Sequence, residues 1–285
     1  VHTDIFNSND VNPRIYFKWH ENRFIFIRLY VDDSQILSNS KFFRDQYKHL
    51  MFKRYGPDLS WKDGLAGITG LEYNINSNKS VTVTVNQYLL KLLHEAGMDN
   101  VPPAITPSLG GLFDTDPDSP KLSIKDADEF RTVNGALIWP LPVRADFQKE
   151  VRFLCSRNSN PTIQDRSKQI QLLRYIKGFP NIGPTFTGDC DSKPGVRING
   201  ASDAAHAVHQ ITGASQLSYL VKVGDKNAPF DSYCGAEKGV ISPEPMSAEY
   251  TCLNKCAKKC RQWRQFANIL GFPSSEPSKI RQDNN

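Results

Sequence analysis

Residues 23–37 read RFIFIRLYVDDSQIL, and an acidic pair separates two apolar segments in this stretch. Residues 24–31 are rich in aromatic and β-branched side chains, which are typical of strands. Asp32 and Asp33 belong to the residue types that favour turns. The stretch therefore predicts an antiparallel hairpin that carries two neighbouring carboxylates at its tip.

Two carboxylates at neighbouring positions repel each other unless a cation neutralises them. Mg²⁺ prefers hard oxygen ligands and is commonly held by one or two carboxylates together with substrate phosphates. The pair Asp32 and Asp33 is therefore a candidate magnesium site. A solvated turn that happens to be rich in Asp is the alternative.

Working outward, the patterning predicts an α+β chain with two blocks of strands. The first block has strands at 14–19, 23–31, 35–39, 71–75 and 81–85, with helices at 40–56 and 87–96. A Pro-rich segment at 102–123 predicts a linker or a surface crossing. Helices at 126–145 and 164–177 and a break near 180–195 follow it. The second block has strands at 196–203, 216–224 and 230–234, a long helix at 245–270, and a short apolar segment at Ile280.

The composition is that of a globular chain of about two domains, or of one large domain, with 285 residues and 39% hydrophobic residues. The longest apolar run is interrupted by Arg28 and is too short to span a membrane. The excess of 35 Lys and Arg over 30 Asp and Glu permits nucleic-acid binding without requiring it. Six cysteines without a secretory signal predict reduced thiols in an intracellular protein, and the start without Met suggests a partial product.

The second block contains carboxylates at positions where they are unexpected. Asp203 is the last residue of a predicted strand in which side chains alternate between the two faces. Glu249 is the first residue of the stripe of mainly apolar side chains along the predicted long helix. A carboxylate on such a stripe is costly unless it is paired, so a functional site is one interpretation. The alternative is an ordinary acidic residue near a helix N-terminus, where the helix dipole favours it.

Other candidates have simpler interpretations. Cys252, Cys256 and Cys260 repeat every four residues, so they predict buried side chains on one helical face rather than a zinc site. His206 and His209 lie near Asp203, but a solvated loop pair is preferred to a metal cluster. We expect Trp61 and Trp139 in the core. A basic helix face, either solvated or in contact with phosphates, is formed by Lys255, Lys258, Lys259, Arg261 and Arg264.

Nine short segments together resemble the Pol polyprotein of Ty1/copia-type retrotransposons, whose reverse transcriptase is followed by ribonuclease H. They include LYVDDSQIL (29–37), FRTVNGALIW (130–139), LLRYIKG (172–178), INGASDAAHA (198–207) and MSAEY (246–250), and they occur in the family's order. The resemblance implies a partial reverse transcriptase palm, thumb and connection, followed by a ribonuclease H-like mixed sheet with helices. The expected domains of the chain are the palm hairpin and thumb at 1–101, the linker and connection helices at 102–194, and a ribonuclease H-like domain, truncated at its C-terminus, at 195–285.

The resemblance also implies two metal-dependent sites. Asp32 and Asp33 match carboxylates of the polymerase, which uses template RNA, a DNA primer and dNTPs. The ribonuclease H ligands are matched by Asp203, Glu249 and Asp283, with Mg²⁺ or Mn²⁺ as the cofactor and an RNA–DNA hybrid as the substrate. The expected location is intracellular, in cytoplasmic virus-like particles, and a nuclear stage is also compatible with the resemblance. No membrane association is expected.

The chain departs from the family pattern at several positions. Fourteen residues before Ile15 are too few for the further palm strand and its Asp, and Asn285 precedes the family's last helix. His206 replaces a Trp, Ala145 replaces a Pro in an Arg-Pro-Asp run, and Pro140 and Pro142 interrupt a helical stretch. We therefore expect an incomplete fragment of the Pol polyprotein, related to an RNA-directed DNA polymerase with ribonuclease H but inactive as a fragment. The alternatives are an inactive remnant that only binds nucleic acid, or a metal-binding interaction module using the three cysteines.

Overall fold

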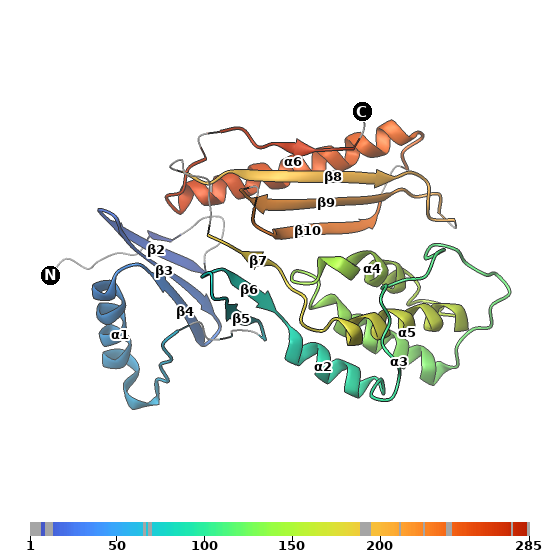
Figure 1. Cartoon of the computed structure of the whole chain (residues 1–285), viewed down its shortest axis with the longest axis horizontal. Helices are drawn as coiled ribbons and strands as arrows, with labels where there is room; N and C mark the ends of the chain where they lie inside the picture. The colour runs from blue at the N-terminus through green and yellow to red at the C-terminus, as the bar shows by residue number, and fades with distance from the viewer. Residues whose placement is uncertain are drawn as a thin grey trace.

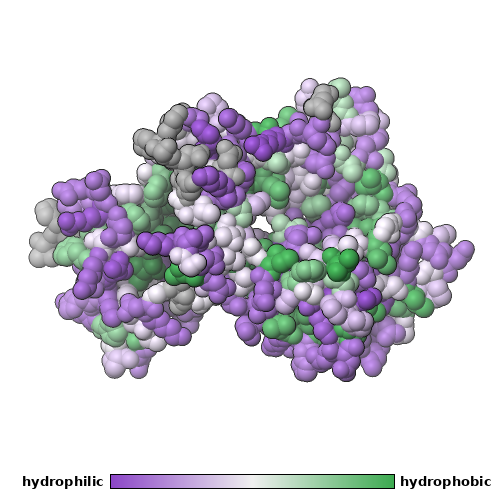
Figure 2. Space-filling model, viewed as in Figure 1, coloured by the Kyte–Doolittle hydropathy of each residue, from purple (hydrophilic) through white to green (hydrophobic). Residues whose placement is uncertain are grey.

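The computed structural model describes residues 7–8, 14–64, 67, 70–188, 195–210, 212–224, 226–237, 241–274 and 276–283. The described part is α+β and contains three sheets, whose strand orders are β1-β2-β3-β4, β5-β6-β7 and β10-β9-β8-β11. Figure 1 shows the last of these sheets and helix α6 lying above a group of helices, with the N-terminal sheet to one side. Hydrophilic residues cover most of the face shown in Figure 2, with smaller hydrophobic patches among them.

The N-terminal sheet contains the hairpin that the sequence predicts. Its antiparallel strands are β1 (Asn7–Ser8), β2 (Ile15–His20), β3 (Arg23–Tyr30) and β4 (Asp33–Ser38). Helix α1 (Lys41–Tyr55) follows, and the Ser40 side chain caps it by accepting a hydrogen bond from the backbone N–H of Phe43. Phe43 packs against Ile25 and Ile27 of β3, so this sheet has a small core of its own. A short 3-10 turn, η1 (Gly56–Asp58), comes next.

The middle of the chain forms the largest core. Its elements are β5 (Glu72–Ile75), β6 (Val81–Thr84), α2 (Asn86–Glu95), α3 (Ile124–Ile138), η2 (Ala145–Phe147), α4 (Gln148–Ser156), α5 (Ile163–Gly178) and β7 (Thr185–Phe186). Leu89 and Leu93 of α2 share one hydrophobic cluster with Phe130 of α3 and Ile176 of α5. The expected boundary between residues 101 and 102 therefore runs through a single core.

The Pro-rich segment predicted as a linker is bound to this core. Leu112 is buried within it. The Lys168 ammonium donates hydrogen bonds to the backbone oxygens of Leu112 and Asp114, and Gln171 donates to that of Thr106. Residues 102–123 thus follow the surface of α5, which agrees with the predicted surface crossing and not with a free linker.

One prediction in this region was wrong, and one helix was missed. The helix predicted at 126–145 ends at Ile138, because Pro140 introduces a turn in which its own carbonyl accepts the backbone N–H groups of Val143 and Arg144. Helix α4 was not predicted, since it is only nine residues long and begins without a side-chain cap. The predicted break near 180–195 contains β7, which pairs with β6, and its residues 189–194 lie outside the described part.

The C-terminal sheet has the predicted order of three strands, helix and strand. It consists of β8 (Ile198–Ala205), β9 (Gln216–Val223), β10 (Pro229–Ala236), α6 (Pro245–Ile269) and β11 (Ile280–Arg281). The first three strands are antiparallel, whereas β11 pairs in parallel with β8. Helix α6 covers β8 and β9 with its three buried cysteines, as the four-residue spacing predicts (Figure 1). None of the described helices is long and apolar enough to cross a membrane.

Candidate metal centre

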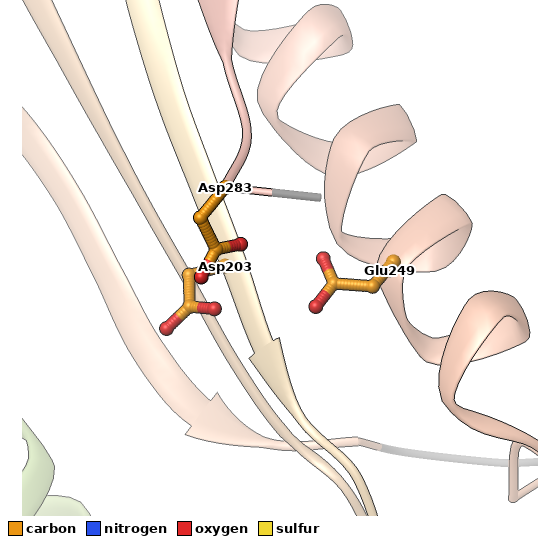
Figure 3. A group of neighbouring side chains, drawn as sticks. All are labelled: Asp203, Glu249 and Asp283. Atoms are coloured by element: carbon orange, nitrogen blue, oxygen red, sulfur yellow. The ribbon is translucent and has the colours of Figure 1, made fainter. Parts of the chain in front are cut away.

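Three carboxylates from separate elements converge at one edge of the C-terminal sheet. Asp203 lies in β8, Glu249 lies near the start of α6, and Asp283 follows β11 (Figure 3). One oxygen atom of each carboxylate lies within 4.8 Å of those of the other two. Asp203 and Asp283 are exposed and Glu249 is half-buried, so the group opens to solvent on one side.

The pairing of the strands explains two of these positions. Ile280 pairs with Gly200 and Arg281 with Ala201, so the parallel register leads Asp283 to the level of Asp203. Both residues therefore extend from the same end of neighbouring strands. Helix α6 packs across β8, and its early residue Glu249 faces the pair.

The Glu249 carboxylate is fixed by two hydrogen bonds. Its Oε1 accepts the backbone N–H of Ala204 at 3.2 Å, and its Oε2 accepts the side-chain amide of Gln282 at 3.2 Å. Burial raises the pKa of Glu249, the Ala204 hydrogen bond opposes this rise, and the charges of Asp203 and Asp283 add to it. The negative charges of the three carboxylates therefore repel one another, and burial adds to the cost of ionising Glu249.

The donor atoms fit a hard divalent cation. Among the described residues, none of the three carboxylates forms a salt bridge with a Lys, Arg or His. Three carboxylates without a cationic partner, open to solvent on one side, are suitable ligands for Mg²⁺ or Mn²⁺. The residues present therefore fit the metal that the sequence analysis expects.

Asp32 and Asp33 occupy the hairpin tip, as predicted, and both are exposed. The preceding Val31 has a φ of 53°, a strained backbone conformation for a β-branched residue. Within the described residues, no further His, Cys, Asp or Glu joins them in a group of three that could hold a metal. The hairpin is confirmed, and a metal at this pair stays a prediction.

The two histidines lie apart from the acidic group and are not simply solvated. His206 hydrogen-bonds through Nε2 to the backbone oxygen of Ser242 at 3.1 Å. The His209 ring contacts Phe113 and hydrogen-bonds to the side chain of Gln216 at 2.8 Å. Both histidines are half-buried, so the preferred interpretation as a solvated pair was wrong.

The expectation of core tryptophans was also wrong for Trp139. This side chain is 40% exposed and packs against Tyr88 at a ring distance of 4.6 Å. Trp61 is half-buried, with the Lys48 ammonium 5.0 Å from its ring centre.

Sequence reasoning missed two residues that support the centre. The Cys252 thiol donates to the backbone oxygens of Asp203 and Ser218, at 3.2 and 3.0 Å, which ties α6 to the strand carrying Asp203. Gln282 links Glu249 to the strand that precedes Asp283. The available signal was proximity in sequence, since Gln282 adjoins Asp283 and Cys252 lies about one helical turn after Glu249.

Comparisons with known proteins place the chain near retrotransposon sequences. An uncharacterized mitochondrial protein of Arabidopsis thaliana, AtMg00810, is 26% identical over 158 residues, covering 54% of this chain and 62% of that protein. The retrovirus-related Pol polyprotein from transposon RE1 of the same plant is 26% identical over 204 residues, covering 70% of this chain and 13% of the polyprotein. No protein-family model and no solved structure matches the chain. The two similarities support a retrotransposon-related origin for a chain that spans only part of each relative.

Proposed function

We propose that residues 195–283 form a ribonuclease H-like domain of a Ty1/copia-type Pol polyprotein, which hydrolyses the RNA strand of an RNA–DNA hybrid with Mg²⁺ or Mn²⁺. The observation that carries this proposal is the convergence of Asp203, Glu249 and Asp283 within 4.8 Å. The strand order β10-β9-β8-β11, with a parallel last strand, supports it because this topology brings the three positions to one edge.

The three carboxylates would divide the work of holding the metal. Glu249 is fixed by Ala204 and Gln282 and supplies a positioned ligand, whereas the exposed Asp203 and Asp283 face the solvent from which a substrate phosphate approaches. Divalent cations bound by such carboxylates activate water and stabilise the leaving oxygen in phosphodiester hydrolysis.

For the first part of the chain we propose a reverse transcriptase origin, in which Asp32 and Asp33 serve RNA-templated DNA synthesis in the intact polyprotein. The exposed hairpin tip and the similarity to the Pol polyprotein of RE1 support this assignment. Template RNA, a DNA primer and dNTPs are the substrates that this reaction requires.

Two other functions compete with hydrolysis. An inactive remnant that only binds nucleic acid would keep the acidic group without turnover. A metal-binding module built on Cys252, Cys256 and Cys260 lacks support, because all three thiols are buried and none belongs to the metal-binding group found in the described residues.

A cleavage assay separates these functions. The full chain is incubated with an end-labelled RNA strand annealed to DNA, in Mg²⁺ or Mn²⁺, beside the Asp203→Asn variant and an Asp128→Asn control on the exposed face of α3. Because all three carboxylates converge in the described residues, we expect cleavage of the hybrid, but not of single-stranded RNA, in the wild type and the control only, in contrast to the inactivity expected of a fragment from its sequence. Equal cleavage by the wild type and Asp203→Asn, or none by either, would contradict hydrolysis at this centre.

A further inference from the structure

A second feature of the C-terminal sheet is a groove between α6 and strands β9 and β10. Its volume is about 300 Å³. Tyr219 of β9 and Tyr233 of β10 form its floor. Four residues of α6 form its wall: Lys255, Lys258, Lys259 and Gln262. We call these six residues the tyrosine–lysine groove.

The floor of the tyrosine–lysine groove is an aromatic pair. Tyr219 and Tyr233 are direct partners in the β9–β10 register, and their rings stack with centroids 5.5 Å apart at an angle of 19°. Tyr219 is buried, whereas Tyr233 is partly accessible. The groove thus offers a rigid aromatic surface, which a planar ligand can contact at a small entropic cost.

The charged groups around the groove leave an excess of positive charge. Asp231 accepts the indole N–H of Trp263 and lies 3.7 Å from the Lys259 ammonium, so it neutralises that lysine. Lys255 and Lys258 form no salt bridge with any residue that the structure describes, and the Lys255 ammonium lies 5.5 Å from the Tyr233 ring centre. The charge of Arg152 on α4 also acts on Tyr233.

We propose that the tyrosine–lysine groove binds a short single-stranded segment of nucleic acid, with phosphates at Lys255 and Lys258 and a base or sugar against Tyr233. Aromatic rings beside cations that follow a phosphate backbone are the features that single-strand binding requires. A duplex would present its phosphates to the lysines, but its stacked bases could not reach a ring recessed below the helix.

The groove is separate from the metal centre. Lys258 lies nine residues after Glu249 on α6, which corresponds to about 14 Å along the helix axis. Binding in the groove therefore needs no metal and goes beyond the proposed hydrolysis. A strand held there would be fixed relative to the acidic group by the same rigid helix.

The test measures binding of a fluorescently labelled oligothymidylate to the full chain by anisotropy, in EDTA, over a series of salt concentrations. The groove variant is Lys255→Gln with Lys258→Gln. Its charge-matched control is Arg261→Gln with Arg264→Gln, on the opposite flank of the same helix. We expect the groove variant to weaken binding about tenfold and to reduce the slope of log affinity against log salt by about 1.4, at roughly 0.7 for each lost contact.

A third variant tests the aromatic floor. Tyr233→Phe keeps the ring and should bind as the wild type does, whereas Tyr233→Leu should weaken binding by about fivefold or more. Equal losses in the lysine and arginine variants, or tighter binding of a DNA duplex with the same dependence on Lys255 and Lys258, would overturn the proposal. Because Asp203→Asn should bind the oligonucleotide normally in EDTA, failure of the groove is distinguishable from failure of the hydrolytic centre.

Discussion

Asp203 and Asp283 extend from the same end of two parallel neighbouring strands, at matching levels of the register set by Gly200 with Ile280 and Ala201 with Arg281. Glu249 completes the group from the helix that covers these strands. The negative charge of the centre is therefore imposed by backbone pairing, and a cation is the natural means of neutralising it.

The first prediction concerns metal binding and stability. Mg²⁺ or Mn²⁺ should raise the melting temperature of the full chain by a few degrees, because a ligand that binds only the folded state stabilises it by about 1–3 kcal/mol at roughly 10 to 100 times its Kd. Asp203→Asn and Glu249→Gln should remove most of this rise, as followed by circular dichroism. Asp128→Asn, at an exposed position on α3 outside the acidic group, is the control and should retain it. An identical metal response in all four proteins would contradict the centre.

The second prediction concerns the close packing of β8 under α6. A Cβ atom at Gly200 would lie 2.5 Å from the Cys256 sulfur and 3.0 Å from that of Cys260. Gly200→Ala should therefore destabilise the chain by about 1–3 kcal/mol in urea unfolding. Combining it with Cys256→Ala should cost less than the sum of the two single changes, because the smaller residue makes room.

Gly135 provides the matched control for this packing argument. It lies in α3, and a Cβ atom there would meet nothing within 4 Å. Gly135→Ala should stabilise by up to about 1 kcal/mol through helix propensity. A comparable loss of stability at both glycines would show that crowding at Gly200 is not the cause.

The third prediction concerns an ion pair in the segment between α3 and α4, in which the arginine is buried and the aspartate is partly exposed. Arg144 is fully buried and forms two hydrogen bonds to Asp146, at 2.9 and 2.8 Å, while Tyr175 donates a third to the same carboxylate. Asp146→Ala should cost about 3–5 kcal/mol of unfolding free energy, because it leaves a buried guanidinium without its partner. Asp128→Ala breaks only an exposed pair with Arg131 and should cost about 1 kcal/mol or less. Similar losses in the two variants would refute this difference.

The fourth prediction concerns stability at high pH. Burial, with a smaller contribution from the charge of Asp231, raises the pKa of Tyr219 to about 12. An unfolded Tyr ionises near pH 10. Between these pH values the folded state keeps a proton that the unfolded state loses. The contribution of Tyr219 to the unfolding free energy is therefore fully present below about pH 10 and is lost as the pH rises towards 12.

Tyr219→Phe should reduce this loss of stability between pH 10 and 12, by up to about 2.7 kcal/mol for a difference of two pKa units. Tyr250→Phe, at an exposed position on α6, serves as the control and should keep the wild-type dependence. Unfolding free energies measured across this range decide between them, and an unchanged slope in Tyr219→Phe would count against the prediction.

Several elements of this protein follow from local sequence alone. The hairpin around Asp32 and Asp33, the alternating strands β8 and β9, and the long helix α6 with its buried cysteines were all predicted close to their observed bounds. Side chains return to the same face every two residues in a strand and about every 3.6 residues in a helix. Where one face of an element is buried, this spacing is visible as a pattern of apolar residues in the sequence.

Tertiary structure decided the remainder. The pairing of β11 with β8 brings Asp283 to Asp203, yet β11 has only two residues and too little pattern to predict a partner. The end of α3 was mispredicted and helix α4 was missed. A turn at Pro140 follows the end of α3, and the pairing of buried Arg144 with Asp146 precedes the start of α4. The sequence alone indicated the candidate carboxylates, Asp203 and Glu249 by their positions and Asp283 by the family resemblance. Only the folded chain brings three of them within 4.8 Å, because their convergence depends on long-range strand pairing and helix packing that no local period encodes.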